Sequence, residues 1–162
     1  MSPIAPDLER DAKYLTFKLG RQEFGLELTR VREILALPEV TVLPLAPKYL
    51  LGVINLRGRV VPVIDLRVKL GMAATEHDSR KCIIVCDVMR GGQPLQMSIL
   101  VDSVSEVLHV GPRDLSAAPA LDEVDTSFIV AIAKSTAGMK LLIDVDIMLS
   151  TAQVTLPSAM LA

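Results

Sequence analysis

The sequence has few of the residues on which ligand chemistry and base stacking depend. Its 162 residues include no Trp, 3% aromatic residues, two Cys and two His. With a formal net charge of −2 and no basic run, this composition argues against nucleic-acid binding, which needs cationic and aromatic surfaces. No uncharged stretch reaches the ~20 residues of a transmembrane helix, and the first ten residues lack the apolar core of a signal peptide. We therefore expect a cytoplasmic protein without direct membrane insertion.

The two cysteines, Cys82 and Cys86, lie in the β-branched run KCIIVC, which predicts a strand. Four residues of a strand rise about 13 Å, whereas the Cα atoms of a disulfide lie within ~7 Å of each other. No third Cys and neither His stands at the spacing of a zinc site. We expect two unreactive thiols, no disulfide and no metal.

What the chain does have is 51% hydrophobic residues and 22% charged residues, which is the composition of a folded domain. Short runs of Val, Ile and Leu alternate with turns that contain Gly, a pattern that predicts an all-β fold. The expected strands are Tyr14–Leu19, Glu23–Leu28, Val31–Leu35, Gly52–Leu56, Val60–Ile64, Cys82–Val88, Leu95–Val101, Val104–His109, Ile129–Ala133 and Met139–Ile143. Short helical turns are expected at Pro47–Leu51 and Leu66–Leu70, and a short C-terminal helix at Val145–Thr151.

The chain also contains an internal echo. The segment VREIL at 31–35 is repeated in kind by VSEVL at 104–108, and VIDL at 63–66 resembles LIDV at 142–145. Two matches in the same order predict two related barrels of similar size.

We therefore expect one domain over residues 12–150 with subdomains at about 12–76 and 77–150. Whether strands are exchanged between the subdomains is left open by the sequence. Residues 1–11 and 152–162 are expected to be loose termini.

Motifs for catalysis are missing, since there is no nucleotide-binding loop, zinc-protease motif or nucleophile elbow. Asp65 and Asp144 follow apolar strands at matching positions, and we interpret both as N-caps of the helical turns that follow. A paired-carboxylate site is the second interpretation. The chain is expected to be a binding module without enzymatic activity or cofactor.

The segment GVINLRGRVVPVIDLR, at 52–67, predicts a hairpin with a tight turn. Gly58 suits a positive φ in the turn, Asn55 can bond the turn backbone, and Pro62 implies an edge strand or a bulge. Arg57 has no neighbouring charge to neutralise it, so we expect it to be exposed and available to a partner's carboxylate or carbonyl groups.

This segment resembles the signature of the CheW family of bacterial chemotaxis coupling proteins, and YLTFKLGRQEFGLEL, VREIL, LPLAPKYL, ILVDSVSEVL and LLIDVDIML agree with it in order. The resemblance implies two SH3-like five-stranded β-barrels packed around a common core, in a monomer without enzymatic activity. It also implies an adaptor that couples the cytoplasmic tip of chemoreceptors to the regulatory domain of the histidine kinase CheA.

Carried over position by position, the resemblance assigns receptor binding to Val31, Glu33, Gly52, Arg57 and Val104. It assigns kinase binding to Ile34, Leu35 and Val60. Simple core packing is the alternative for the apolar members of both sets.

Two positions depart from the family pattern, because Ser98 and Ala131 stand where Gly is usual. Ala131 is expected to lie near the receptor groove, where it would narrow the groove or change the choice of receptor. Two other functions stay open: an adaptor of a chemosensory system with another output, such as pili, and a β-barrel that binds a small molecule.

Overall fold

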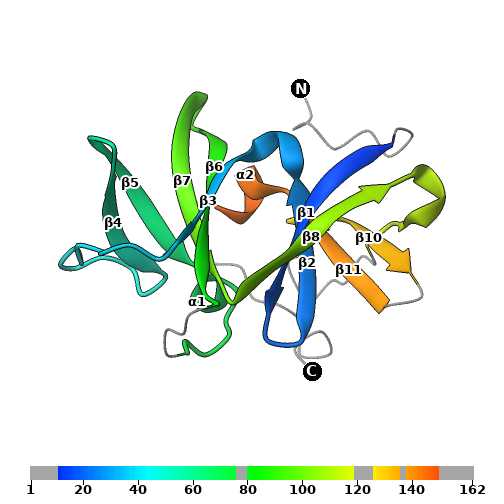
Figure 1. The fold of residues 1–162 in the computed structure, drawn as a ribbon, viewed down its shortest axis with the longest axis horizontal. Helices are drawn as coiled ribbons and strands as arrows, with labels where there is room; N and C mark the ends of the chain where they lie inside the picture. The colour runs from blue at the N-terminus through cyan, green and yellow to red at the C-terminus, as the bar shows by residue number, and fades with distance from the viewer. Residues whose placement is uncertain (1–10, 76–79, 119–125, 136–137, 150–162) are drawn as a thin grey trace.

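The computed structural model describes residues 11–75, 80–118, 126–135 and 138–149. Within them the fold is all-β, with two sheets side by side (Figure 1). Sheet A has the order β8-β1-β2-β11-β10-β9 and sheet B the order β3-β6-β7-β5-β4. Sheet A consists of β1 (Ala12–Leu19), β2 (Gln22–Glu27), β8 (Ser103–Val110), β9 (Leu115–Ser116), β10 (Ile129–Ser135) and β11 (Gly138–Ile143). Sheet B consists of β3 (Val31–Ala36), β4 (Leu50–Leu56), β5 (Arg59–Asp65), β6 (Cys82–Arg90) and β7 (Gln93–Val101).

The predicted all-β class and the ten predicted strands are confirmed, with β9 as an eleventh strand that makes sheet A six-stranded. Two residues are too few to carry a strand pattern, and β9 forms only because it pairs with β10. The 3₁₀ turns η1 (Leu28–Arg30) and η2 (Pro112–Asp114) were not predicted either.

The short helices follow the prediction in two of three places. Helix α1 (Leu66–Lys69) and helix α2 (Val145–Met148) are present. Leu149 is the C-cap of α2, and the last two residues of the predicted C-terminal helix, 150–151, lie outside the described residues. Where a short helical turn was predicted, at Pro47–Leu51, the structure has one hydrogen-bonded turn and no helix. The Leu50 N–H donates to the Pro47 carbonyl at 3.0 Å, which makes one turn, and β4 begins at Leu50.

Each sheet takes strands from both halves of the chain. The hairpin β1–β2 joins β8 to β11 in sheet A, and the hairpin β6–β7 joins β3 to β5 in sheet B. The two sheets therefore do not coincide with the stretches 12–76 and 77–150 that were expected to form the two subdomains. The arrangement explains the echo: β3 and β8 are each an edge strand, and β5 and β11 each pair in parallel with the second strand of a hairpin.

Sheet B curls until its two ends meet. The edge strands β3 and β4 stand at opposite ends of the strand order, yet Glu33 of β3 contacts Arg57 of the β4–β5 turn at 2.5 Å. The chain after β3 also crosses to β4, where the Thr41 N–H donates to the Val53 carbonyl at 2.8 Å and the Val53 N–H returns to Thr41 at 2.9 Å. These contacts close the sheet into a barrel.

Alternation along the strands divides the apolar side chains among three cores. In β6, Ile83 and Val85 face the interior of the sheet B barrel, whereas Ile84, Cys86 and Val88 belong to the large cluster that the two sheets share. A third cluster, around Tyr14, Val110, Ala131, Ala133 and Leu142, lies on the other face of sheet A. The core between the barrels is thus built from the outward faces of both sheets.

Asp65 and Asp144 are N-caps, which confirms the first interpretation. Asp65 Oδ1 accepts from the Arg67 N–H at 3.1 Å, and Asp144 Oδ1 accepts from the Asp146 N–H at 2.8 Å and the Ile147 N–H at 3.2 Å. Each carboxylate satisfies free N–H groups at a helix start.

Two arginines hold the sheets together. Arg67, which follows sheet B, donates from Nε and Nη2 to Asp102 at 2.7 and 2.5 Å, and Asp102 also accepts from the Gly20 N–H in the β1–β2 turn at 2.7 Å. On the other side, Arg30 between the sheets pairs with Asp146 of α2. Charge-assisted bonds of this kind fix the relative placement of the two barrels.

Of the two alternatives predicted for Pro62, the edge strand is wrong, because β5 lies between β7 and β4, whereas the pairing of β4 with β5 does have a bulge nearby, between Leu50 and Gly52. Proline is tolerated there because pairing with β7 starts one residue later, at Val63 opposite Ser98. The missing N–H of Pro62 therefore stands at the end of the ladder with β7 and interrupts none of the bonds within it.

Candidate partner-binding site

The β4–β5 hairpin holds Arg57 in a tight two-residue turn. Both turn residues have positive φ, 51° at Arg57 and 87° at Gly58, which is the mirror-image turn that suits the twist of a hairpin. The Gly58 N–H donates to Asn55 Oδ1 at 2.8 Å, so the predicted bond from Asn55 to the turn is confirmed. A positive φ is unusual for an arginine, and it fixes the direction in which the side chain leaves the turn.

Arg57 is exposed, as predicted, but it is not without a charged neighbour. Its Nη2 lies 2.5 Å from Glu33 Oε1, and the side chains are 65% and 26% exposed. The sequence missed this pair because the two residues are 24 positions apart and meet only when sheet B closes. The structure thus brings two predicted receptor-binding residues into direct contact at the mouth of the barrel.

Gly52, a third predicted receptor-binding residue, is buried in β4 beside a bulge between Leu50 and Gly52. A Cβ atom at Gly52 would lie 2.2 Å from the Thr41 carbonyl oxygen and 2.7 Å from a methyl group of Val40. No Cβ atom tolerates that approach to backbone. The absence of a side chain therefore lets the β3–β4 connection pack on β4, and Gly52 shapes the site without presenting a group to a partner.

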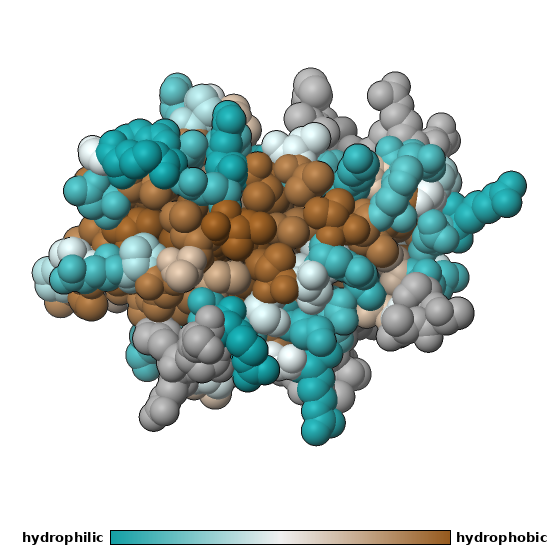
Figure 2. All heavy atoms as spheres, viewed as in Figure 1, coloured by the Kyte–Doolittle hydropathy of each residue, from teal (hydrophilic) through white to brown (hydrophobic). Residues whose placement is uncertain are grey.

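Val31 and Val104 lie at the rim of the core that the barrels share. Both are half-buried and pack against the shared cluster, Val31 from the start of β3 and Val104 from β8. Ile34 is 43% exposed and stands opposite Ile84, a member of that cluster. Figure 2 shows a band of hydrophobic side chains on this face, over β3 and β8. The rim is an apolar surface between the two barrels.

The three predicted kinase-binding residues face different ways. Ile34 is on the side of the shared core, whereas Leu35 packs against the interior cluster of the sheet B barrel. Val60 is 73% exposed and lies on β5, opposite Asn55. The side chains of Ile34 and Val60 are exposed and accessible to a partner protein, whereas Leu35 is half-buried and packs against the sheet B barrel.

Sequence reasoning missed Arg32 and Asp87, whose side chains form an ion pair at 2.5 Å between β3 and β6. The pair stands beside Val31 and Glu33 and adds fixed charge to the same edge. In the sequence, Arg32 and Asp87 are visible only as charged residues within two apolar strands. Nothing in the sequence indicates that these two strands are neighbours.

The two departures from the family pattern have separate surroundings. Ser98 is buried and donates from Oγ to the Pro62 carbonyl at 2.9 Å. Ala131 is fully buried in the cluster on the far face of sheet A, with Tyr14 and Leu142. Its φ is not positive, since Leu45 and Arg57 are the non-glycine residues with positive φ in the described ranges. Alanine is therefore accommodated without strain.

Neither cysteine is in a disulfide, as predicted. Burial raises the pKa of the Cys86 thiol to about 12 and also raises that of Cys82, so both stay protonated at neutral pH. Among the residues whose positions are described, no three His, Cys, Asp or Glu side chains gather in a way that could hold a metal ion.

Comparison with known proteins decides the family. The family described as "CheW-like domain" matches residues 13–153. This chain belongs to the CheW-like domain family. The chain is 38% identical to the "Chemotaxis protein CheW" of Rhizobium meliloti (strain 1021) over 82% of this chain and 83% of that protein. It is 32% identical to the protein of the same name from Klebsiella aerogenes, over 89% and 85% of the two chains.

The crystal structure of the scaffolding protein TtCheW from Thermoanaerobacter tengcongensis is similar, with a TM-score of 0.75 at 29% identity over 85% of this chain and 91% of that one. The CheW resemblance found in the sequence is confirmed, and so is the fold class. The CheW-like chain is a chemotaxis coupling adaptor, and neither another output nor a small-molecule barrel is favoured. Within the described part of the chain, no helix has the length and apolarity needed to cross a bilayer.

Proposed function

We propose that this CheW-like adaptor couples the cytoplasmic tip of chemoreceptors to the regulatory domain of a CheA-type histidine kinase. The observation that carries the proposal is the apolar rim between the barrels, where Val31 and Val104 meet the shared core beside the Glu33–Arg57 pair. A receptor tip is a helical hairpin, and an apolar groove with charges at its edge suits the apolar face of a helix.

On this proposal the receptor contacts Val31, Val104 and Arg57, while Glu33 orients the arginine and Gly52 lets the barrel close. The kinase contacts Ile34 and Val60 from the side of sheet B, with Leu35 supporting β3 from within. The adaptor acts in the cytoplasm as a monomer until it joins the array, and it has no enzymatic activity or cofactor. Its work is to hold two partners in fixed relative positions, for which two barrels linked by half-buried ion pairs are suited.

The experiment is co-sedimentation and kinase activation with vesicles that contain a chemoreceptor and CheA. Val104→Asp puts a charge on the rim and should abolish capture by receptor vesicles while binding to CheA is retained. Val60→Asp should do the reverse. Val42→Asp is the matched control, since Val42 is 73% exposed in the β3–β4 connection. Melting temperatures show whether each variant is folded. If folded Val104→Asp still binds receptor vesicles as wild type does, the rim is not the receptor site.

A further inference from the structure

The two sheets differ where their parallel strands meet. In sheet A, residues 140–143 of β11 pair with 23–26 of β2. In sheet B, only residues 63–65 of β5 pair with 98–100 of β7. The capping residues Asp65 and Asp144 place position 63 in correspondence with position 142. Sheet A also pairs the two preceding residues, Lys140 and Leu141, whereas the corresponding residues 61 and 62 of sheet B do not pair with β7.

Pro62 explains why the ladder stops. It has no N–H to donate, and its carbonyl accepts from Ser98 Oγ at 2.9 Å. Both of its backbone groups are thus unavailable to a ladder with β7. Ser98 corresponds to Gly25 of sheet A. Its hydroxyl forms the last hydrogen bond between β7 and β5 before the two strands separate.

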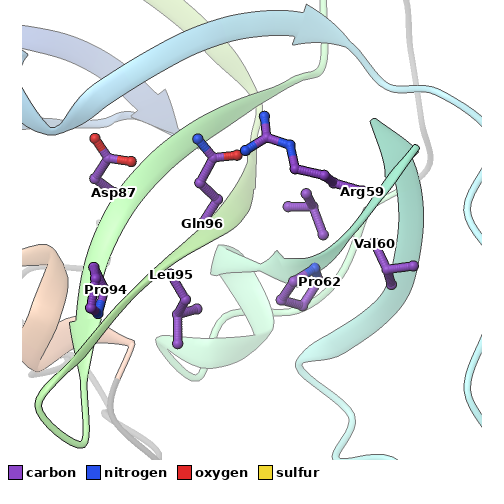
Figure 3. Close-up of a pocket in the computed structure, with 8 residues that line it drawn as sticks. Arg59, Val60, Pro62, Asp87, Pro94, Leu95 and Gln96 are labelled. Atoms are coloured by element: carbon purple, nitrogen blue, oxygen red, sulfur yellow. The ribbon is translucent and has the colours of Figure 1, made fainter. Parts of the chain in front are cut away.

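Beyond this point β5 and β7 enclose a groove of about 570 Å³ (Figure 3). Arg59, Val60 and Pro62 line it from β5, and Leu95 and Gln96 line it from β7. Figure 3 shows the Arg59 side chain reaching across from β5 toward the side where Gln96 lies. Four strand residues rise about 13 Å, so the groove offers the length of a short extended segment.

Gln96 has a buried acceptor that the protein leaves unused. Its Oε1 is buried and finds no hydrogen-bond partner among the described residues. The corresponding residue of sheet A is Glu23, whose carboxylate lies 3.3 Å from Lys140 Nζ. In sheet B the residue that corresponds to Lys140 is Val61, which has no donor. An unpaired buried acceptor is costly, and a donor brought by a ligand removes that cost.

The groove also carries one uncompensated positive charge. Asp87, on the β6 side, is neutralised by Arg32 at 2.5 Å. Arg59 is exposed, and none of the described acidic side chains pairs with it. The complementary ligand is therefore an anion that also brings an N–H donor and an aliphatic surface.

We propose that the β5–β7 groove binds an extended segment of a partner protein that carries a carboxylate side chain. The carboxylate pairs with Arg59, and an aliphatic side chain packs on Leu95 and Pro62. Rotation of the Gln96 amide about its last side-chain bond turns Oε1 into the groove, where a backbone N–H of the segment donates to it. This is strand addition at an interrupted ladder. Val60, which we assign to the kinase contact, lines the same groove, but the strand-addition site does not depend on the coupling role.

The test is titration of the ¹⁵N-labelled full chain with the peptide acetyl-Thr-Val-Glu-Val-Thr-amide into the millimolar range. Amide shifts are expected at positions 59–61 and 95–97. Arg59→Glu should weaken binding by about tenfold or more, and the same peptide with Lys in place of Glu should bind this variant better than wild type. Gln96→Leu should weaken binding by about three- to tenfold. Arg21→Glu, an exposed charge change in the β1–β2 turn, is the matched control and should bind as wild type does.

Absence of amide shifts at the groove residues overturns the proposal. So does a result in which Arg59→Glu binds the Glu peptide as wild type does, or binds the Lys peptide no better than wild type does. Dimerisation that Arg59→Glu abolishes also overturns it, because the groove then seats a second copy of the chain. The unperturbed spectrum of each free variant shows that it is folded. Since the peptide is measured on the free chain, failure here leaves receptor and kinase coupling intact, and failure of coupling leaves this result standing.

Discussion

Replacement of Arg57 separates its contribution to folding from its contribution to binding. Arg57→Ala removes the 2.5 Å pair with Glu33 but keeps a non-glycine residue at a φ of 51°. Because the arginine side chain is 65% exposed, solvent screens the pair, and its loss should cost about 0.5–1 kcal/mol of the free energy of unfolding. For a chain of this size that lowers the melting temperature by about 1–4 °C.

Arg57→Gly removes the same pair but relieves the positive φ, which costs about 1 kcal/mol for a residue with a Cβ. The two effects nearly cancel, so Arg57→Gly should unfold near the wild-type temperature and above Arg57→Ala. Both variants lack the guanidinium and should lose receptor coupling alike. The free energy of unfolding should therefore differ between the two variants, while receptor coupling is lost in both.

The assay combines urea unfolding of the free variants with kinase activation in reconstituted receptor vesicles. A loss of more than about 3 kcal/mol in Arg57→Ala would mean that the pair is a buried structural element, contrary to its exposure. Lower stability in Arg57→Gly than in Arg57→Ala would refute the turn geometry. Normal kinase activation by both variants would remove Arg57 from the receptor site.

Three further predictions follow from single contacts. Gly52→Ala should lower the free energy of unfolding by about 3 kcal/mol or more, because its Cβ would meet the Thr41 carbonyl at 2.2 Å. Gly91→Ala, with nothing within 4 Å of its Cβ, should lose only about 1 kcal/mol in the same urea titration; equal losses would contradict this. Burial alone would raise the pKa of Asp102, but the hydrogen bond from Arg67 and that from the Gly20 N–H outweigh it and hold this pKa below its usual value. Its stabilisation is thus fully present above the unfolded pKa of about 3.9 and is lost as pH falls through the lower folded pKa. Asp102→Asn should be destabilised at neutral pH and converge with wild type in strong acid, as urea unfolding across pH will show; a constant difference would exclude the ion pair as the cause. Cys86, with its thiol pKa raised to about 12, should resist a thiol reagent at pH ~8 in the folded chain and react once the chain is unfolded; rapid reaction of both thiols before unfolding would show that β6 opens.

The local features of this protein follow from its sequence, because they depend on neighbours along the chain. The strands are evident from β-branched alternation, as in KCIIVC. The caps at Asp65 and Asp144 are evident because a carboxylate bonds N–H groups two and three residues later. Asn55 and Gly58 predicted the hairpin turn for the same reason. The positive φ of Arg57 was not predicted, because arginine has no preference for that conformation. Val31 and Val104, which are predicted to bind a receptor, lie in segments that agree with the family pattern, so their strands were predicted as well.

Closure and strand exchange were decided only by the tertiary structure. Glu33 and Arg57 pair because the ends of a curled sheet meet, and Arg67, Asp102 and Gly20 meet because hairpins are exchanged between the sheets. Pro62 marked a break in pairing, but which strand it failed to pair with depends on the parallel placement of β5 beside β7. Pairing between distant segments is selected by the burial of whole sheet faces. No window of the sequence contains both partners, so the groove beside Gln96 exists only in the folded chain.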